Sequence, residues 1–326
     1  SSSTDVSCFG GNDGTATAAA TGGTAPYSYL WPSTNIDSNE VNLSAGTYVV
    51  TVTDSKGCLD SASITITEPT VLVASISSST DVSCFGGNDG TATAAATGGT
   101  APYSYLWPSA NMDSNEVNLS VGSYEVTITD SNGCLDSASV VITEPTALVA
   151  SISSSTNVSC FDGNDGTATA SATGGTAPYS YLWPSTNIDS NEVNLSAGTY
   201  VVTVTDNNGC TDTASIIITE PTVLAASISN STNVSCFGGN DGTATAVATG
   251  GTAPYSYLWP STNIDSNEIN LSAGTYVVTV TDSKGCLDSA SITITEPTVL
   301  VASISSSTDV SCFGGNDGTA TAAATG

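Results

Sequence analysis

Nine cysteines give this 326-residue chain its clearest capacity for covalent chemistry. They fall into two series, each with a constant interval between its members: the loop cysteines Cys8, Cys84, Cys160, Cys236 and Cys312, and the hairpin cysteines Cys58, Cys134, Cys210 and Cys286. Zinc sites use cysteines in CxxC or CxxH pairs, whereas these cysteines are single and the chain has no histidine. The regular spacing therefore predicts disulfides and an oxidising compartment.

Two disulfide pairings are compatible with the repeat. Pairing Cys8 with Cys58, within one repeat, closes about 50 residues, and pairing Cys58 with Cys84 closes about 26. The chain-entropy model assigns these loops about 4 and about 3.6 kcal/mol, a difference too small to decide between them. Side-chain alternation favours pairing within the repeat, because Cys58 shares the parity of the apolar residues Ala62 and Ile64. This pairing leaves Cys312 without a partner, and the alternative leaves Cys8.

The chain lacks the residues that most enzymes need. A serine nucleophile requires a neighbouring base, but there is no histidine, and Lys and Arg together number 2. The net charge of −28 repels nucleic acid and anionic membranes, so neither is expected as a partner. We therefore expect no catalytic residue and no cofactor.

Aspartates recur in the predicted turns. Asp13, Asp54 and Asp60 would suit a structural calcium ion if the fold brought them together. The chain has no EF-hand pattern, and aspartates in turns commonly accept hydrogen bonds from their own backbone. We favour this capping role and keep calcium as the alternative.

An Asp-Ser/Thr-Ala triplet follows each hairpin cysteine. It resembles the site at which Bacteroidota O-glycosylate exported proteins, and its hydroxyl residue is predicted to face solvent. The candidate O-glycosylation sites are Ser61, Ser137, Thr213 and Ser289. The alternative interpretation is an outward-facing polar position of a strand.

Tyr27, Tyr29 and Trp31 alternate along one predicted strand, which Pro32 ends. Aromatic rings on one face could form a platform for stacking sugars. We favour a core position on a central strand, with the tryptophan packed against the small alanines of the strand predicted at 15–21, because large side chains opposite small ones let two sheets pack closely.

The element that positions these groups is a hairpin at 46–67. Residues 46–53 alternate β-branched and aromatic side chains with period two, residues 54–57 supply a turn, and alternation resumes from Cys58. The Leu43-Ser44-Ala45-Gly46 lead-in to Tyr48 is typical of a tyrosine corner. Six or seven short strands are expected in each repeat, with further strands at 71–76, 27–31 and 41–43 and an extended segment at 5–8.

The whole chain is a tandem array of this unit. Residues 229–304 differ from residues 1–76 at only four positions, and the chain stops in mid-repeat, as a piece of a longer array would. The expected fold is all-β, with tandem immunoglobulin-like antiparallel β-sandwich modules of about 76 residues. The expected domains are 1–69, which lacks its first strand, then 70–145, 146–221 and 222–297, and a partial repeat at 298–326. No run of 18 apolar residues occurs, so we expect any signal peptide or anchor to lie outside these residues.

Four motifs together carry a family resemblance. In the first unit they are VSCFGGNDG from Val6, GGTAPYSYLW from Gly22, LSAGTYVVTVTDSKGC from Leu43 and ITEP from Ile66. This order closely resembles the SprB-type repeat of very large surface adhesins of gliding Bacteroidota, over each unit from end to end. The resemblance implies an extracellular, cell-surface filament of immunoglobulin-like modules with no catalytic residue.

The expected function is therefore structural: a non-catalytic repeat region that forms an extended extracellular filament or stalk. The alternative is a set of carbohydrate-binding modules that grip surface polysaccharide. Self-association into a fibre is expected, with exchange of strands between chains as one route, because identical neighbouring modules favour domain swapping.

Overall fold

The computed structural model describes residues 1–326, which form strands, turns and loops. They divide into two compact units. The first unit comprises Ser1–Val149 with the segments Gly174–Pro178 and Asp206–Cys210, and the second comprises Ala150–Thr173, Tyr179–Thr205 and Thr211–Gly326. The structure contains no helix with the length and apolar character needed to span a membrane.

The first unit holds modules 1 and 2, with six strands each. The strands of module 1 are β1 (Ser2–Thr4), β2 (Gly14–Thr17), β3 (Ser28–Leu30), β4 (Asn39–Leu43), β5 (Gly46–Thr53) and β6 (Leu59–Ile66). Those of module 2 are β7 (Val73–Thr80), β8 (Gly90–Thr97), β9 (Ser104–Leu106), β10 (Asn115–Leu119), β11 (Gly122–Thr129) and β12 (Leu135–Ile142).

Modules 3 and 4 repeat this order, and a hairpin follows them. The strands of module 3 are β13 (Val149–Thr156), β14 (Gly166–Thr173), β15 (Ser180–Leu182), β16 (Asn191–Leu195), β17 (Gly198–Thr205) and β18 (Thr211–Ile218). Those of module 4 are β19 (Ala225–Thr232), β20 (Gly242–Thr249), β21 (Ser256–Leu258), β22 (Asn267–Leu271), β23 (Gly274–Thr281) and β24 (Leu287–Ile294). The hairpin consists of β25 (Val301–Thr308) and β26 (Thr319–Thr325).

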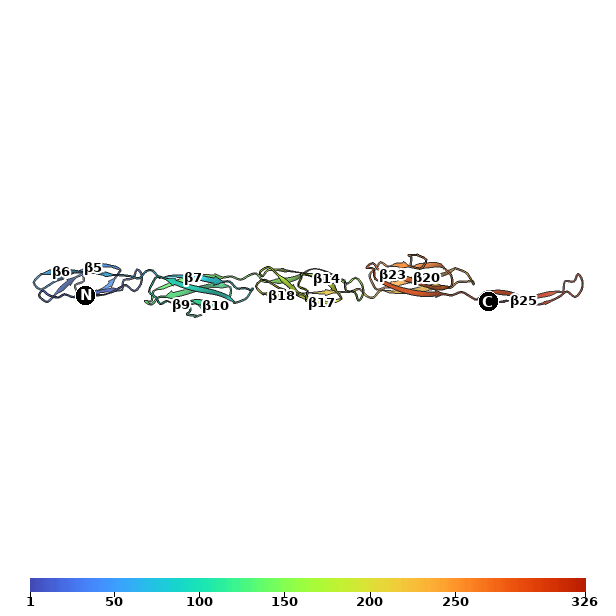
Figure 1. Ribbon diagram of the computed structural model, residues 1–326, viewed down its shortest axis with the longest axis horizontal. Coiled ribbons are helices and arrows are strands. Elements are labelled where there is room, and N and C mark those ends of the chain that lie inside the picture. The colour runs from blue at the N-terminus through green and yellow to red at the C-terminus, as the bar shows by residue number, and fades with distance from the viewer. The chain divides into compact units, whose positions relative to one another are not determined.

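Each module consists of two three-stranded antiparallel sheets (Figure 1). In module 2 one sheet has the order β7-β8-β10 and the other β9-β11-β12, and the other modules use the same order. The fold is thus an all-β array of immunoglobulin-like sandwiches, as predicted. The hairpin of β5 and β6 pairs over its full length, from Gly46 opposite Ile66 to Thr53 opposite Leu59.

The tyrosine corner is confirmed in every module. The hydroxyl of Tyr48 donates a hydrogen bond of 3.0 Å to the Ser44 carbonyl oxygen, four residues upstream. The same bond, also 3.0 Å long, joins the corresponding residues of the other modules: Tyr124 to Ser120, Tyr200 to Ser196 and Tyr276 to Ser272. This bond ties the start of the central strand to the loop before it.

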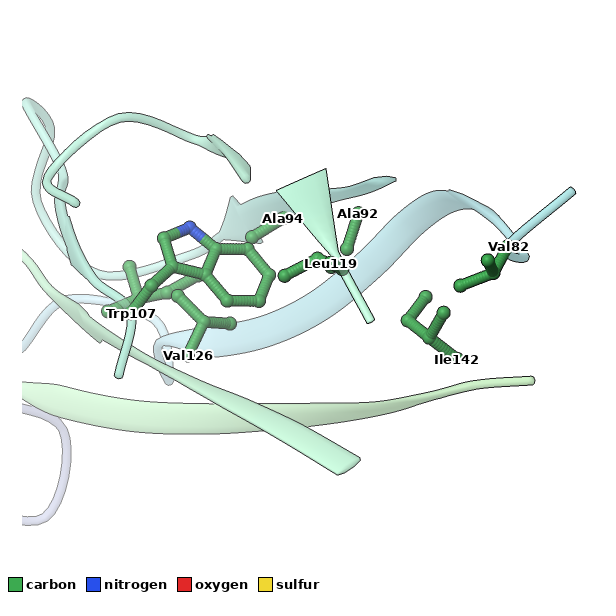
Figure 2. Close-up of a cluster of buried hydrophobic side chains, with 8 residues drawn as sticks. Val82, Ala92, Ala94, Trp107, Leu119, Val126 and Ile142 are labelled. Carbon is green, nitrogen blue, oxygen red and sulfur yellow. The ribbon is translucent and has the colours of Figure 1, made fainter. Parts of the chain in front are cut away.

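The core lies between the two sheets, as Figure 2 shows for module 2. Trp107 is 1% exposed and packs in one cluster with Ala92 and Ala94, which confirms the predicted opposition of large and small side chains. Burying an indole of this size contributes several kcal/mol to the stability of a module. The Trp107 indole N–H donates to the Asp113 carbonyl oxygen at 3.0 Å, so burial leaves no unpaired polar atom on the ring.

Four predicted elements differ from the observed ones. The strand predicted at 15–21 is β2 in module 1 and ends at Thr17. The strand predicted as central at 27–31 is the short strand β3 at a sheet edge, because β5 lies between β3 and β6. Residues 5–8 form a loop rather than extended strand. The strand predicted at 71–76 begins at Val73 and continues to Thr80 in module 2.

A buried carboxylate fastens the loop between the two sheets. Glu116 is 6% exposed and accepts a hydrogen bond of 2.7 Å from the Asn111 amide nitrogen. The same amide donates to the Asn115 carbonyl oxygen at 2.8 Å. These bonds hold the loop that follows the core tryptophan, which explains why the Glu116 carboxylate is buried.

Candidate functional site: the disulfide-bridged junctions

The loop cysteines lie at the C-terminal end of each module. The loop of Cys8 is fastened to the end of β6, because the Val6 N–H donates to the Thr67 carbonyl oxygen at 3.0 Å and the Thr67 N–H donates to Asp5 at 2.8 Å. The Gly10 N–H donates to a Glu68 carboxylate oxygen at 2.6 Å. Glu68 belongs to the linker that leaves the module, so this bond couples the loop to the linker.

The hairpin cysteines lie at the opposite, N-terminal end. In module 2 the Asp130 carboxylate accepts backbone hydrogen bonds from Cys134 and Asn132, both at 2.9 Å, and from Thr100 at 2.8 Å. Asp130 is 5% exposed, and its buried carboxylate holds two loops together, the one that contains Thr100 and the one that contains Cys134. Burial alone would raise the pKa of Asp130, but the hydrogen bonds from Cys134, Thr100 and their neighbours outweigh it and lower the pKa below the ordinary value of 3.8.

A disulfide joins these two ends across each junction. Cys8 of module 1 is bonded to Cys134 of module 2, with 5.7 Å between their Cα atoms. The Asn132 side-chain amide adds a hydrogen bond of 2.9 Å to the Ser7 carbonyl oxygen beside it. The two equivalent bridges, Cys84–Cys210 and Cys160–Cys286, have the same sequence separation of 126 residues. Each bridge therefore joins a loop cysteine to the hairpin cysteine of the next module.

The predicted disulfide pairing is wrong, and so is its alternative. In module 2 the eight-residue strand β12 separates Cys134 from Thr143, and the Thr143 carbonyl oxygen accepts a hydrogen bond from Val82, two residues before Cys84. The two cysteines of one module are thus about 27 Å apart, at about 3.4 Å per residue, whereas a disulfide requires Cα atoms within about 7 Å. Cys58, Cys236 and Cys312 are free and exposed, although pairing was predicted for the first two.

The linker between modules 1 and 2 is packed against a glycine pair of module 2. The Gly99 N–H donates to the Thr70 carbonyl oxygen at 2.8 Å. A Cβ added to Gly98, which has φ +71°, would overlap the Val71 carbonyl oxygen. Only glycine provides both this backbone conformation and the missing side chain. The linker is therefore held at both ends, by Glu68 before it and by this glycine pair after it.

The three aspartates considered for calcium serve as separate backbone caps. Asp13 accepts hydrogen bonds from the backbone and hydroxyl of Ser7, the hydroxyl bond being the larger influence, and they lower the Asp13 pKa. Asp54 accepts from Cys58 and Thr24, which lower its pKa. The structure brings no three His, Cys, Asp or Glu side chains together as a metal site. The capping interpretation explains why these residues recur.

The aspartate of the candidate glycosylation triplet also has a structural role. The carboxylates of Asp136, Asp212 and Asp288 accept hydrogen bonds of 2.7 to 2.8 Å from the backbone N–H groups of Ala74, Ala150 and Ala226. These bonds tie the last strand of a module to its first. The four candidate hydroxyl residues Ser61, Ser137, Thr213 and Ser289 are exposed, and their O-glycosylation stays a prediction.

Two of the three aromatic residues considered for a sugar platform, Trp31 and Tyr29, face inward. Trp31 is 3% exposed, and Tyr29 packs against the same core cluster. The Tyr27 hydroxyl donates to the Gly22 carbonyl oxygen at 2.5 Å. These rings support the fold and the glycine-rich loop, so they do not make a stacking platform.

Two residues of the junction escaped the sequence analysis. Glu68 has an equivalent in every module, and Glu144, Glu220 and Glu296 make the same bond to the backbone of the cysteine loop, at 2.6 to 2.7 Å. Asn132 and Asn208 bridge to the preceding module. The position of Glu68 next to the linker proline could have indicated the role of these glutamates. No pattern within one repeat could indicate the role of Asn132 and Asn208, since the partner of each lies in another repeat.

Comparison with known proteins identifies the repeat. A family model described as "SprB repeat" matches residues 1–34, 76–112, 152–186, 228–262 and 304–326, about half of the chain. Each match covers the first part of a unit, whereas the resemblance was expected to extend from end to end. No curated protein matches the chain.

Among solved structures, the chain is similar to several multidomain proteins. The N-terminal domains of the bacteriophage RB49 highly immunogenic outer capsid protein are 14% identical, with 70% of this chain and 100% of that chain covered and a TM-score of 0.37. Invasin, a bacterial integrin-binding protein, is 12% identical over 96% of this chain and 82% of its own, with a TM-score of 0.31. The immunoglobulin domains 1–5 of Sidekick-1 are 12% identical over 83% and 74%, with a TM-score of 0.28. On the matches of the family model, this chain belongs to the SprB repeat family.

Proposed function

We propose that this chain is a structural, non-catalytic repeat region that bears tension in an extended extracellular stalk or filament of a bacterial surface adhesin. The repeat family and the three disulfides support this function, because disulfides persist in oxidising compartments outside the cytoplasm. The absence of histidine and the scarcity of lysine and arginine in the sequence are consistent with a non-catalytic role.

The observation that carries the proposal is the overlap of the disulfide loops. The loop closed by Cys8–Cys134 overlaps the one closed by Cys84–Cys210, which in turn overlaps the one closed by Cys160–Cys286. A covalent route can therefore leave the backbone at Cys8, continue from Cys134 to Cys160, and cross again to Cys286. Tension applied along the chain follows this shortest route.

The route bypasses most of the modules. From Cys134 to Cys160 it contains about 26 residues, or roughly 90 Å when extended, whereas the backbone from Cys8 to Cys286 would extend to about 950 Å. Most of the segment from Cys134 to Cys160 already belongs to the extended strands β12 and β13 and the linker between them. Unfolding a module between the bridges would therefore add little length to an oxidised chain under load.

Single-molecule force spectroscopy on the chain, with a handle at each terminus, tests this role. The oxidised chain should show no long extension steps from the modules between Cys8 and Cys286. After reduction with a phosphine, each module should unfold in a step of roughly 220 Å, because 76 residues extend to about 260 Å and a folded module spans about 30–40 Å.

A variant with one bridge removed provides the matched control. Cys134→Ser leaves Cys84–Cys210 and Cys160–Cys286, so the load passes through module 1 and through the 50 residues between Cys160 and Cys210. It should therefore restore long extension steps that the oxidised wild-type chain lacks. Long steps in the fully oxidised wild-type chain, equal to those after reduction, would contradict a load-bearing function. Carbohydrate binding is not proposed, because Trp31 and Tyr29, two of the three rings it would use, pack in the core.

A further inference from the structure

The three disulfides interleave along the chain. The loop closed by Cys84–Cys210 contains Cys134 and Cys160, and each of these two cysteines is bonded to a cysteine outside that loop. Every bridge therefore passes over a cysteine that belongs to another bridge, and none joins cysteines that are neighbours in the sequence. The bridged cysteines could pair in many other ways. The observed pairing must therefore be selected during folding.

An unfolded chain favours other pairs. Cys134 and Cys160 are about 26 residues apart, whereas the cysteines of each observed bridge are 126 residues apart. The entropic cost of closing a loop grows with its length, so the shorter loop closes about 10-fold more readily. Cys84 and Cys134, which are about 50 residues apart, also close a shorter loop than an observed bridge does. These are the two kinds of pair considered from the sequence alone, and neither is present in the folded chain.

Either of these bridges prevents folding. Cys84 and Cys134 lie at opposite ends of module 2, so a bridge between them is incompatible with the folded module. A bridge from Cys134 to Cys160 would require β12 and β13, which lie between them, to fold back side by side. Each strand already has its neighbours, because β12 pairs with β11 and is bonded to β7, and β13 pairs with β14 and is bonded to β18. A chain that is oxidised too early therefore stays misfolded until the bridge breaks.

The folded modules select the observed pairs. At the first junction, the Asn132 side-chain amide donates to the Ser7 carbonyl oxygen, a contact that involves neither cysteine side chain. It holds the two loops together, and the Cα atoms of Cys8 and Cys134 are 5.7 Å apart, within the range that a disulfide needs. Folding and contact between the modules therefore have to precede the final oxidation.

The bridges are accessible to another protein. The cysteines of all three bridges are only partly buried, so an external thiolate can reach their sulfur atoms. A large apolar side chain follows each bridged loop cysteine, and Phe9, Phe85 and Phe161 are 58%, 61% and 53% exposed. None of them belongs to a core cluster. Exposed aromatic side chains are favoured contacts in protein interfaces, and here one lies next to each bridge.

We propose that this chain is a substrate of a thiol–disulfide isomerase that docks on Phe9, Phe85 and Phe161 and rearranges bridges formed before folding. The partner is a protein with a reactive thiolate beside an apolar surface that accepts the phenylalanine. The proposal goes beyond the load-bearing role and does not depend on it, because it concerns how the bridges form and not what force they bear.

The rearrangement leaves the number of disulfides unchanged. A thiolate of the isomerase attacks the Cys134 sulfur of an incorrect Cys134–Cys160 bridge, which forms a mixed disulfide and releases Cys160 as a thiolate. After folding, the Cys8 thiolate attacks the Cys134 sulfur, forms the observed bridge and releases the thiolate of the isomerase. Cys160 exchanges in the same way with a bridge that holds Cys286. One S–S bond breaks for each one that forms, so no net oxidant is consumed.

Refolding of the full chain tests the need for this step. The variant Cys58→Ser, Cys236→Ser, Cys312→Ser keeps only the cysteines of the observed bridges. One sample is oxidised with oxidised glutathione in urea, freed of glutathione and then refolded, and a second is refolded in the reduced state and then oxidised. Peptide mapping without reduction should find bridges between neighbouring cysteines in the first sample and the three observed bridges in the second.

Addition of an isomerase to the first sample tests the partner. With catalytic protein disulfide isomerase and reduced glutathione, the observed bridges should replace the incorrect ones within minutes, against hours with reduced glutathione alone. Observed bridges that form equally fast without the isomerase would overturn the proposal, and so would incorrect bridges that persist in its presence.

A second variant tests the docking residues. Phe9→Ser, Phe85→Ser and Phe161→Ser together should slow the catalysed rearrangement several-fold. Refolding of the reduced chain should stay unchanged, because all three side chains lie outside the core.

The matched control removes three apolar side chains from another exposed loop. Ile36, Ile188 and Ile264 are 70%, 72% and 70% exposed, and each lies between the third and fourth strands of its module. Their replacement by serine should leave the rate of catalysed rearrangement unchanged. Equal rates for the phenylalanine variant and this control would overturn the docking role.

Discussion

At the scale of single residues, hydrogen-bonded carboxylates supply stability that a larger hydrophobic core would otherwise provide. Asp5, Asp13 and Asp54 each accept backbone hydrogen bonds that fasten a loop, and such loops surround every junction cysteine. Because these bonds favour the charged form, the pKa of each group lies below the ordinary aspartate value. Part of the negative charge of the chain thus has a local structural role.

The modules should lose stability in acid. The backbone N–H of Thr143 donates to Asp81 at 2.7 Å and lowers its pKa, so the unfolded chain binds a proton more readily than the folded one as the pH falls. The stabilisation is present above about pH 3.8 and disappears as the pH falls through the lower pKa of the folded state.

Asp81→Asn isolates this effect. Modules 3 and 4 already have Asn157 and Asn233 at this position, and their side-chain oxygens accept the same bond at 3.0 and 2.9 Å. The variant should match the wild type in urea unfolding at pH 7 and lose less stability between pH 4 and pH 2. Asp81→Ala, which removes the acceptor, should have a lower free energy of unfolding than the wild type at both pH 4 and pH 2. Parallel pH curves for Asp81→Asn and the wild type would contradict the assignment.

One residue departs from the repeat in a strained position. Asp162 has φ 57°, where modules 1, 2 and 4 have Gly10, Gly86 and Gly238 with φ between 70° and 72°. A left-handed conformation is unfavourable for a residue with a Cβ, even though aspartate tolerates it better than most. Asp162→Gly should therefore raise the free energy of unfolding of module 3 by roughly 0.5–1 kcal/mol. The reverse change, Gly86→Asp, should lower that of module 2 by a similar amount, as measured by chemical denaturation.

At the scale of structural elements, the linker depends on close backbone contact with a glycine. Gly98→Ala should destabilise module 2 by about 3 kcal/mol or more, because the new Cβ meets the Val71 carbonyl oxygen and also has to adopt φ +71°. Gly133 has φ +87° but open space around it, so Gly133→Ala should cost only the conformational strain, about 1 kcal/mol. Thermal unfolding of the two variants compares these costs. Equal losses would mean that the linker contact contributes nothing.

The hairpins follow the alternation of their sequence closely. In β11, Val126 and Ile128 are 0% exposed, while the alternate residues Glu125 and Thr127 point away from the core, as period two requires. The edge strands were harder to predict. Strand β3 has only three residues between a glycine-rich loop and the core tryptophan, and its place at the edge depends on which strands pair. Local alternation contains no information about that choice.

At the scale of the whole molecule, each disulfide links neighbouring modules instead of stabilising one. In the chain-entropy model, closing a loop of 126 residues contributes about 5 kcal/mol, which benefits the two modules that share the bridge. Cys134→Ser should therefore lower the melting temperature of modules 1 and 2 and leave module 4 unchanged, as followed by hydrogen exchange of each module. Loss of stability in module 2 alone would indicate a different role for the bridge.

By itself, the sequence determined the length of the repeat, the all-β sandwich, the tyrosine corner, the packing of tryptophan against alanine and the involvement of cysteine in disulfides. Each of these depends on residues that are near one another along the chain or on the same face of one strand. Only the tertiary structure decided which cysteines meet, because that depends on the end of a module at which each one lies. Cys84 and Cys134 are separated by the length of a strand, whereas Cys8 and Cys134 lie at ends that adjoin.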